Sequence, residues 1–191
     1  MDERRGKTAA VKQALEFINK TNKSDLVLMT DADAMFELDT VPNLLKWFTD
    51  KSIGCVGATP KRIGQRIEEE GHRTLFSMVR HLESKIDSTP FLEGSCMVWR
   101  TSSLDFEALH VTSNADDAQI ATNVLIHGLR VVQDSDAHFI DHAPFERKEH
   151  SRQKVRRAQG LQRHLLRQRE HYYNRRLGRF APILRQEAAL H

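Results

Sequence analysis

The chain has 191 residues, of which 39% are hydrophobic, with a mean hydropathy of −0.55 and a formal net charge of +3. This length and composition predict one globular domain with one core. No apolar stretch approaches the roughly 18 residues of a membrane span, and no charged-then-apolar signal segment opens the chain, so we expect neither. Cys55 and Cys96 are far apart in apolar surroundings, which predicts buried free thiols and favours a cytosolic compartment.

In chain order, the apolar pattern predicts alternating helices and short strands. The expected elements are a helix over 8–19, a strand over 25–30, a helix over 41–50, a short strand over 53–58 ended by Pro60, a helix over 66–84, a loop and strand over 91–99, a helix over 116–127, a strand over 129–133 and a long basic helix over 153–173. This alternation predicts an α/β fold. Because a helix almost opens the chain, we expect the domain to be incomplete at its N-terminus.

Charge divides the chain into two parts. Residues 1–145 carry 16 Lys and Arg and 22 Asp and Glu, a net charge of −6, whereas residues 146–191 carry 13 and 4, a net charge of +9. We therefore expect a partial catalytic core over 1–145 and a basic helical segment over 146–191. A basic segment favours an anionic partner, such as phosphate groups, nucleic acid or a membrane surface, although a solvated helix face remains an alternative.

Asp31 and Asp33 come just after the apolar run 26–29, which fits a central strand. Open α/β sheets bind ligands beyond the carboxyl ends of their strands. Two carboxylates this close repel each other unless a cation neutralises them, and a divalent cation that also holds diphosphate oxygens needs one or two carboxylates. The pair predicts a metal site, and a solvated turn is the alternative on these residues alone.

Gly6 and Lys7 begin the first predicted helix, where free amides and a cation can meet phosphate. A P-loop is not supported, because Met1 stands where that motif requires glycine. Asp116 and Asp117 begin a later helix. This acidic pair either caps the helix and complements its dipole, or supplies a general base and its supporting neighbour.

The last predicted helix brings Gln153, Arg156 and Arg157 to one face. Arginine binds phosphate through two parallel hydrogen bonds, and a neighbouring glutamine can bind hydroxyl groups. The alternative is a basic helix that lies in solvent or on anionic lipid.

These segments, in this order, resemble the family 2 glycosyltransferases of the GT-A fold, and in particular processive members such as cellulose and hyaluronan synthases. The resemblance runs from Gly6 to about Gly160. It rests on Gly6-Lys7-Thr8-Ala9-Ala10-Val11-Lys12-Gln13-Ala14-Leu15, on the Asp-x-Asp motif Asp31-Ala32-Asp33, on Phe91-Leu92-Glu93-Gly94-Ser95, on the acidic pair Asp116-Asp117, and on Gln153-Lys154-Val155-Arg156-Arg157, which is similar to Gln-x-x-Arg-Trp.

The resemblance implies a GT-A-like fold, a Rossmann-like mixed sheet flanked by helices. It also implies a metal-dependent, inverting, hexosyltransferase-like enzyme of polysaccharide biosynthesis. It would move a sugar from a nucleotide-diphospho-sugar, UDP-linked, to a saccharide or lipid-linked acceptor. The resemblance implies Asp117 as base and Asp116 as its support, Mg²⁺ or Mn²⁺ on Asp33 and Asp31, the donor on Gly6, Lys7 and Asp31, and the acceptor or the diphosphate on Gly94, Ser95, Gln153, Arg156 and Arg157.

Two departures leave alternatives open. Arg157 stands where the last motif has tryptophan, so processivity is undecided, and the family's opening strand is missing, so this shortened chain could be a catalytically dead fragment. A nucleotidyltransferase also places Asp-x-Asp after a strand. A nucleic-acid-binding module is less favoured, because the basic segment offers few aromatic residues for base stacking. We expect a location on the cytoplasmic side, with the basic segment against an anionic membrane.

Overall fold

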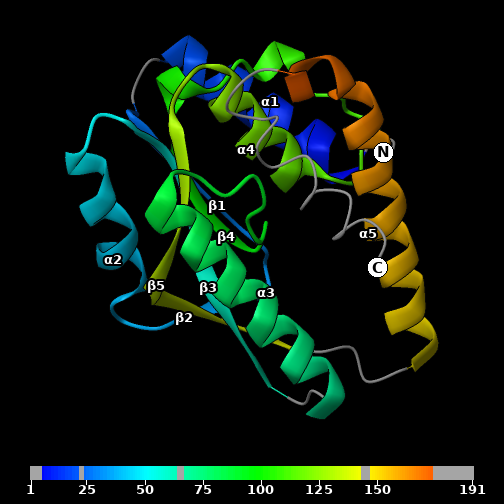
Figure 1. Ribbon diagram of the computed structural model, residues 1–191. Coiled ribbons are helices and arrows are strands. Elements are labelled where there is room, and N and C mark those ends of the chain that lie inside the picture. Colours follow the sequence, from blue (N-terminus) through cyan, green and yellow to red (C-terminus); the bar gives the residue numbers. More distant parts are fainter. Residues whose placement is uncertain (1–5, 22–23, 64–66, 143–146, 174–191) are drawn as a thin grey trace.

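The computed structural model describes residues 6–21, 24–63, 67–142 and 147–173, and every structural statement below refers to these ranges. A five-stranded mixed sheet in the order β1-β4-β3-β5-β2 forms the centre, and five α-helices surround it (Figure 1). The strands are β1 Leu26–Thr30, β2 Met35–Phe36, β3 Ile53–Ile63, β4 Cys96–Arg100 and β5 Arg130–His142; the helices are α1 Lys7–Thr21, α2 Thr40–Lys46, α3 Ile67–Ile86, α4 Asp116–Ile126 and α5 Arg147–Arg167. This architecture confirms the α/β prediction.

Alternating side chains of the sheet fill a core on each face. Cys55 packs with Leu15 of α1 and Ile120 of α4, whereas the next residue, Val56, packs with Leu44 of α2 on the opposite face. Because successive side chains of a strand point to opposite faces, a strand that is buried on both faces reads as a continuous apolar run. The prediction of buried free thiols is confirmed, since Cys55 and Cys96 are both buried and unpaired.

Four strands differ from the sequence prediction. The short strand β2 was not predicted. Within the described residues β1 lies at an edge and pairs only with β4, so the expectation of a central strand is wrong. β3 continues past Pro60, because beyond Gly57 it pairs with β5 alone and a proline there costs no ladder hydrogen bond on its other side. β5 extends to His142 although its middle is polar; the backbone amides of Asp136 and Ala137 donate to Asp134 and satisfy its buried carboxylate.

The helices agree more closely with the prediction. Those expected over 8–19, 66–84 and 116–127 correspond to α1, α3 and α4, and the one expected over 41–50 is α2 followed by a short 3₁₀ turn, Trp47–Thr49. The basic helix begins earlier than expected, at Arg147, and gives way to a 3₁₀ turn at Arg169–Tyr173. Among the described helices, none has the length and apolarity that crossing a bilayer requires. The predicted boundary at 145 falls outside the described residues, so the two-part division stays a prediction.

Strand register determines where the functional residues meet. β1 and β4 are antiparallel, with Thr30 opposite Cys96, so the residue that follows β1 lies beside the residue that precedes β4. The amide of Asp31 accordingly donates to the carbonyl oxygen of Ser95, at 3.4 Å. Residues of the first turn of α4 and of α5 lie near this same end of the sheet.

Candidate active site

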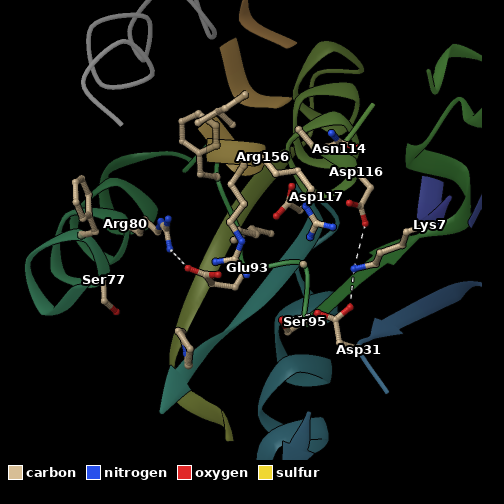
Figure 2. Close-up of a pocket in the computed structure, with 18 residues that line it drawn as sticks. Lys7, Asp31, Ser77, Arg80, Glu93, Ser95, Asn114, Asp116, Asp117 and Arg156 are labelled. Carbon is tan, nitrogen blue, oxygen red and sulfur yellow. Dashed lines mark hydrogen bonds and ion pairs between the residues drawn. The ribbon is translucent and has the colours of Figure 1, made fainter. Parts of the chain in front are cut away.

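A cavity of about 260 Å³ opens at this end of the sheet (Figure 2). Its walls come from α1, the loop after β1, β3, α3, the loop before β4, the start of α4 and α5. The lining residues are Lys7, Asp31, Pro60, Phe76, Ser77, Arg80, Phe91, Leu92, Glu93, Gly94, Ser95, Asn114, Ala115, Asp116, Asp117, Arg156, Arg157 and Leu161. The cavity therefore combines four carboxylates with four cations and a small apolar wall.

The Lys7 ammonium joins two acidic segments that are far apart in the chain. Its Nζ lies 2.6 Å from Oδ1 of Asp31 and 3.3 Å from Oδ2 of Asp116 (Figure 2). Burial alone would lower the pKa of Lys7, but the Asp116 and Asp31 carboxylates raise it above its ordinary value. Lys7 is therefore a fixed positive charge at the floor of the cavity.

Asp31 is held as an anion. Ser95 donates from Oγ to the second oxygen of Asp31, Oδ2, at 2.8 Å. Burial alone would raise the pKa of Asp31, but the hydrogen bonds from Lys7 and Ser95, with the charges of Lys7 and Arg157, hold that pKa below its ordinary value. The carboxylate is thus ionised at neutral pH and is oriented by two donors.

Asp117 has the opposite electrostatic setting. Burial, followed by the negative charges of Asp116 and Glu93, raises the pKa of Asp117 to about 6, although the amide of Ala118 donates to its Oδ1 at 2.8 Å. A carboxylate whose pKa lies near neutrality is suited to accept a proton from a bound hydroxyl group. Among the acidic residues of the cavity, Asp117 is therefore the strongest candidate for a general base.

Gly94 makes the position of Asp117 sterically possible. A Cβ atom at Gly94 would lie only 3.1 Å from Cβ and 3.3 Å from Oδ2 of Asp117. Glycine at this position lets the loop before β4 pass directly against the acidic side chain.

A second ion pair lies on the other side of the cavity (Figure 2). Nη1 of Arg80, from α3, is 3.0 Å from Oε1 of Glu93, and their side chains are only 12% and 22% exposed. Glu93 belongs to the segment 91–95 on which the family resemblance rests, but the sequence predicted no role for it. The sequence did not predict Arg80 as a site residue. Glu93 could have been singled out as a charged residue in an apolar motif, whereas nothing in the helix pattern marks Arg80.

α5 brings two arginines to the cavity. It packs closely on the loop before α4, where a Cβ atom at Gly160 would lie 3.1 Å from the backbone carbon of Asn114. Leu161 and Leu165 add apolar contacts with Phe91 and Ala118, among others. This docking brings Arg156 and Arg157 to the cavity lining from a segment that is distant in sequence.

The structure brings together most of the residues predicted from sequence. Lys7, Asp31, Gly94, Ser95, Asp116, Asp117, Arg156 and Arg157 all line the cavity. Three predicted residues do not line it: Asp33, which is exposed in the turn after β1; Gly6, which precedes α1 with a φ of +88°; and Gln153, which is half-buried on α5. The individual roles of all these residues stay predictions.

The donor set suits a hard divalent cation that also binds substrate phosphates. In the described part of the chain, no three His, Cys, Asp or Glu side chains gather closely enough to form a closed metal site. Mg²⁺ or Mn²⁺ that binds a diphosphate needs only one or two protein carboxylates. The ionised Asp31 carboxylate supplies such a ligand, and its ion pair with Lys7 shows that this position favours positive charge. Asp31, with Asp33 in the adjoining turn, therefore fits this kind of metal binding.

Among the comparisons with known proteins, the one with solved structures gives a match. No family model and no curated protein sequence matches the chain. Among solved structures, a mannosyltransferase from Pyrobaculum calidifontis, determined in complex with GDP-mannose and Mn²⁺, is similar with a TM-score of 0.76 and 28% sequence identity. The match covers 98% of this chain and 50% of the mannosyltransferase, so the chain spans half of that protein's length. The chain therefore has the GT-A fold and is grouped, by its structure, with the glycosyltransferase superfamily.

Proposed function

We propose that the chain catalyses metal-dependent transfer of a sugar from a nucleoside-diphosphate sugar to a hydroxyl group, with inversion at the anomeric carbon. The observation that carries the proposal is the cavity itself. Its lining includes Asp117, which we propose as the base, the anchored anion Asp31, and the cations Lys7, Arg156 and Arg157, and this combination supports the proposal. Such a site can both activate an acceptor and neutralise a departing diphosphate.

The donor half of the reaction uses the positive side chains. The bond between the anomeric carbon and the phosphate oxygen breaks, and the leaving nucleoside diphosphate takes the electron pair. Lys7, Arg156 and Arg157 face the cavity and would stabilise the negative charge that develops on the diphosphate. A divalent cation bound at Asp31, with Asp33 nearby, would supply Lewis-acid neutralisation of the same diphosphate.

The acceptor half of the reaction uses Asp117. The acceptor oxygen forms a new bond to the anomeric carbon on the face opposite the leaving group, and its proton passes to Asp117. With a pKa of about 6, Asp117 is mostly ionised at neutral pH and holds the proton better than an ordinary aspartate does. Asp116 would support this base through its charge and through its ion pair with Lys7.

The nature of the donor follows partly from the comparison. The similar mannosyltransferase binds GDP-mannose, whereas the resemblance of the motifs points to a UDP-linked donor. We therefore propose a nucleoside-diphosphate hexose as the donor class. The acceptor would be a saccharide or a lipid-linked hydroxyl compound, held near Gly94, Ser95 and the apolar wall of Phe76 and Phe91.

The decisive experiment measures transfer and donor binding separately. GDP-mannose and UDP-hexoses are incubated with the chain, Mn²⁺ and a panel of saccharide and lipid acceptors, and release of nucleoside diphosphate is followed with and without acceptor. We expect acceptor-dependent release that EDTA abolishes. Release of pyrophosphate instead would indicate nucleotidyl transfer and overturn the proposal.

The same assay tests the base. Because Asp117→Asn keeps the side-chain shape but cannot take the proton, we expect a fall in kcat of about 100-fold or more, the usual contribution of a general base, with unchanged nucleotide binding by calorimetry. Asp136→Asn is the matched control, since Asp136 is 71% exposed and lies outside the cavity. Near wild-type transfer by Asp117→Asn would show that another group is the base.

A further inference from the structure

We infer that Glu93, held by Arg80, is a positioning residue for Asp117: its negative charge, added to that of Asp116, raises the pH above which Asp117 can take a proton from the acceptor. The inference rests on the proposed role of Asp117 as the base. It adds a function for an ion pair to which neither the sequence motifs nor the comparisons assign one.

The Arg80–Glu93 pair is better protected from solvent than the Lys61–Glu37 pair is. Arg80 and Glu93 are 3.0 Å apart with side chains 12% and 22% exposed. The Lys61–Glu37 pair has a similar separation, 2.7 Å, but its side chains are 50% and 40% exposed. Exposed pairs are screened by water and salt, whereas partly buried charges act strongly on their neighbours. The charge of Glu93 is therefore effective inside the cavity.

The chain path brings Glu93 close to Asp117. Glu93 directly precedes Gly94, and Asp117 packs against that glycine so tightly that a Cβ atom there would lie 3.3 Å from Oδ2 of Asp117. In Figure 2, the carboxylates of Glu93 and Asp117 face the same cavity, from the loop before β4 and from α4. The negative charge of Glu93 is one of the causes of the raised pKa of Asp117.

Asp117 is placed between two ion pairs. In Figure 2, Arg80 and Lys7 lie on opposite sides of the cavity, with Glu93, Asp117 and Asp116 between them. The charged groups that face this space are Lys7 from α1, Asp31 from the loop after β1, Arg80 from α3, Glu93 from the loop before β4, Asp116 from α4, and Arg156 and Arg157 from α5. Lys7 pairs with Asp116 on one side of the base, and Arg80 pairs with Glu93 on the other.

This arrangement predicts pH effects of opposite sign for the two members of the pair. Glu93→Gln removes a negative charge and leaves the positive charge of Arg80, so ionisation of Asp117 becomes easier. Arg80→Gln removes the positive charge and leaves the carboxylate of Glu93, so ionisation of Asp117 becomes harder. The double variant loses one negative and one positive charge, so the local net charge stays the same. The pH at which Asp117 ionises should therefore return toward the wild-type value.

The experiment is the pH dependence of kcat/KM for these variants, with GDP-mannose or the best UDP-hexose as donor. The acidic limb of this profile reports the base in the free enzyme. We expect it to move down by about half a pH unit or more in Glu93→Gln and up by about as much in Arg80→Gln. We expect the double variant to lie within about 0.3 units of the wild type. Glu37→Gln, which alters the exposed pair, is the control and should leave the limb in place.

A second measurement does not depend on transfer. Carboxyl ¹³C NMR of the folded chain identifies Asp117 as the resonance that Asp117→Asn removes, and its titration is followed in the same variants. Shifts of opposite sign in the two single variants support the inference. Equal shifts, or lower activity with an unmoved titration, show that the pair is only structural and overturn it. If no donor supports transfer by the wild type, the proposed function fails, while this titration still decides the electrostatic role of Glu93.

Discussion

A single side chain, Asp117, combines a proposed functional advantage with a structural cost. Its carboxylate lies against Gly94, and burial, followed by the negative charges of Asp116 and Glu93, raises its pKa to about 6. The folded chain thus holds the proton of Asp117 more tightly than the unfolded chain does. The contribution of this group to stability is complete below its ordinary pKa of 3.8 and is lost as the pH rises through about 6.

Asp117→Asn should therefore stabilise the protein at neutral pH while it removes the proposed base. We expect the free energy of unfolding to rise by on the order of 1–3 kcal/mol near pH 7.5, with the gain vanishing near pH 4. Urea denaturation of both chains at several pH values measures this difference. A gain that persists at low pH would mean that the side chain is strained for another reason.

The buried His164 also makes the stability of the protein depend on pH, but it does not disturb this comparison. Burial, with the positive charges of Arg167 and His110, lowers the pKa of His164 to about 4. Its stabilising contribution is therefore lost as the pH falls from about 6.5 through 4, the opposite direction to Asp117. Because His164 is present in both chains, its effect cancels in the comparison, and the difference isolates Asp117.

At the level of elements, the site depends on how α5 docks on α4 and on the loop before it. His164 of α5 and Thr122 of α4 form a buried hydrogen bond of 2.9 Å, and Gly160 lets the helix approach the backbone of Asn114. Arg156 and Arg157 lie about one turn before Gly160 on the same helix. Their placement over the cavity therefore depends on contacts that they do not make themselves.

Gly160→Ala tests this dependence. The added methyl group would lie 3.1 Å from the Asn114 backbone, which cannot yield as a flexible side chain can, so α5 must shift. We expect an increase of about threefold to tenfold in the donor KM, equivalent to roughly 1 kcal/mol, with a smaller change in kcat. Gln159→Ala, at an exposed position of the same helix, is the control. An unchanged KM would show that the helix position does not govern donor binding.

The sequence predicted some of these elements and their ends, but not all of them. The acidic pair of α4 and the Asp-x-Asp turn were predictable, because each follows or begins a strongly patterned element. β5 was expected to end at Gln133, since Asp134, Ser135 and Asp136 break the apolar pattern. The backbone amides and the Trp47 indole that satisfy Asp134 come from its fold, and a sequence pattern does not reveal such partners.

At the scale of the whole molecule, the site joins segments from nearly the full length of the described chain. Lys7 and Arg157 line one cavity, although 149 residues stand between them in the sequence. The order of motifs predicted the fold, and most of the site residues that it predicted meet in this cavity. It did not predict Arg80, because α3 approaches the cavity through the packing of the sheet and carries no motif of its own.

The edge position of β1 has a consequence for experiments in solution. Within the described residues, hydrogen bonding to β4 alone holds the strand that leads to Asp31, and Leu28 is 37% exposed. Amides on its outer side should exchange rapidly with deuterium in the free chain. Since a bound nucleotide and Mn²⁺ would anchor the end of this strand, we expect peptides that cover 26–31 to take up deuterium more slowly in the complex. α2 packs on the face of the sheet opposite to α1 and α4, so its peptides should take up deuterium equally with and without ligand. Slower deuterium uptake in β1 would therefore indicate an occupied cavity.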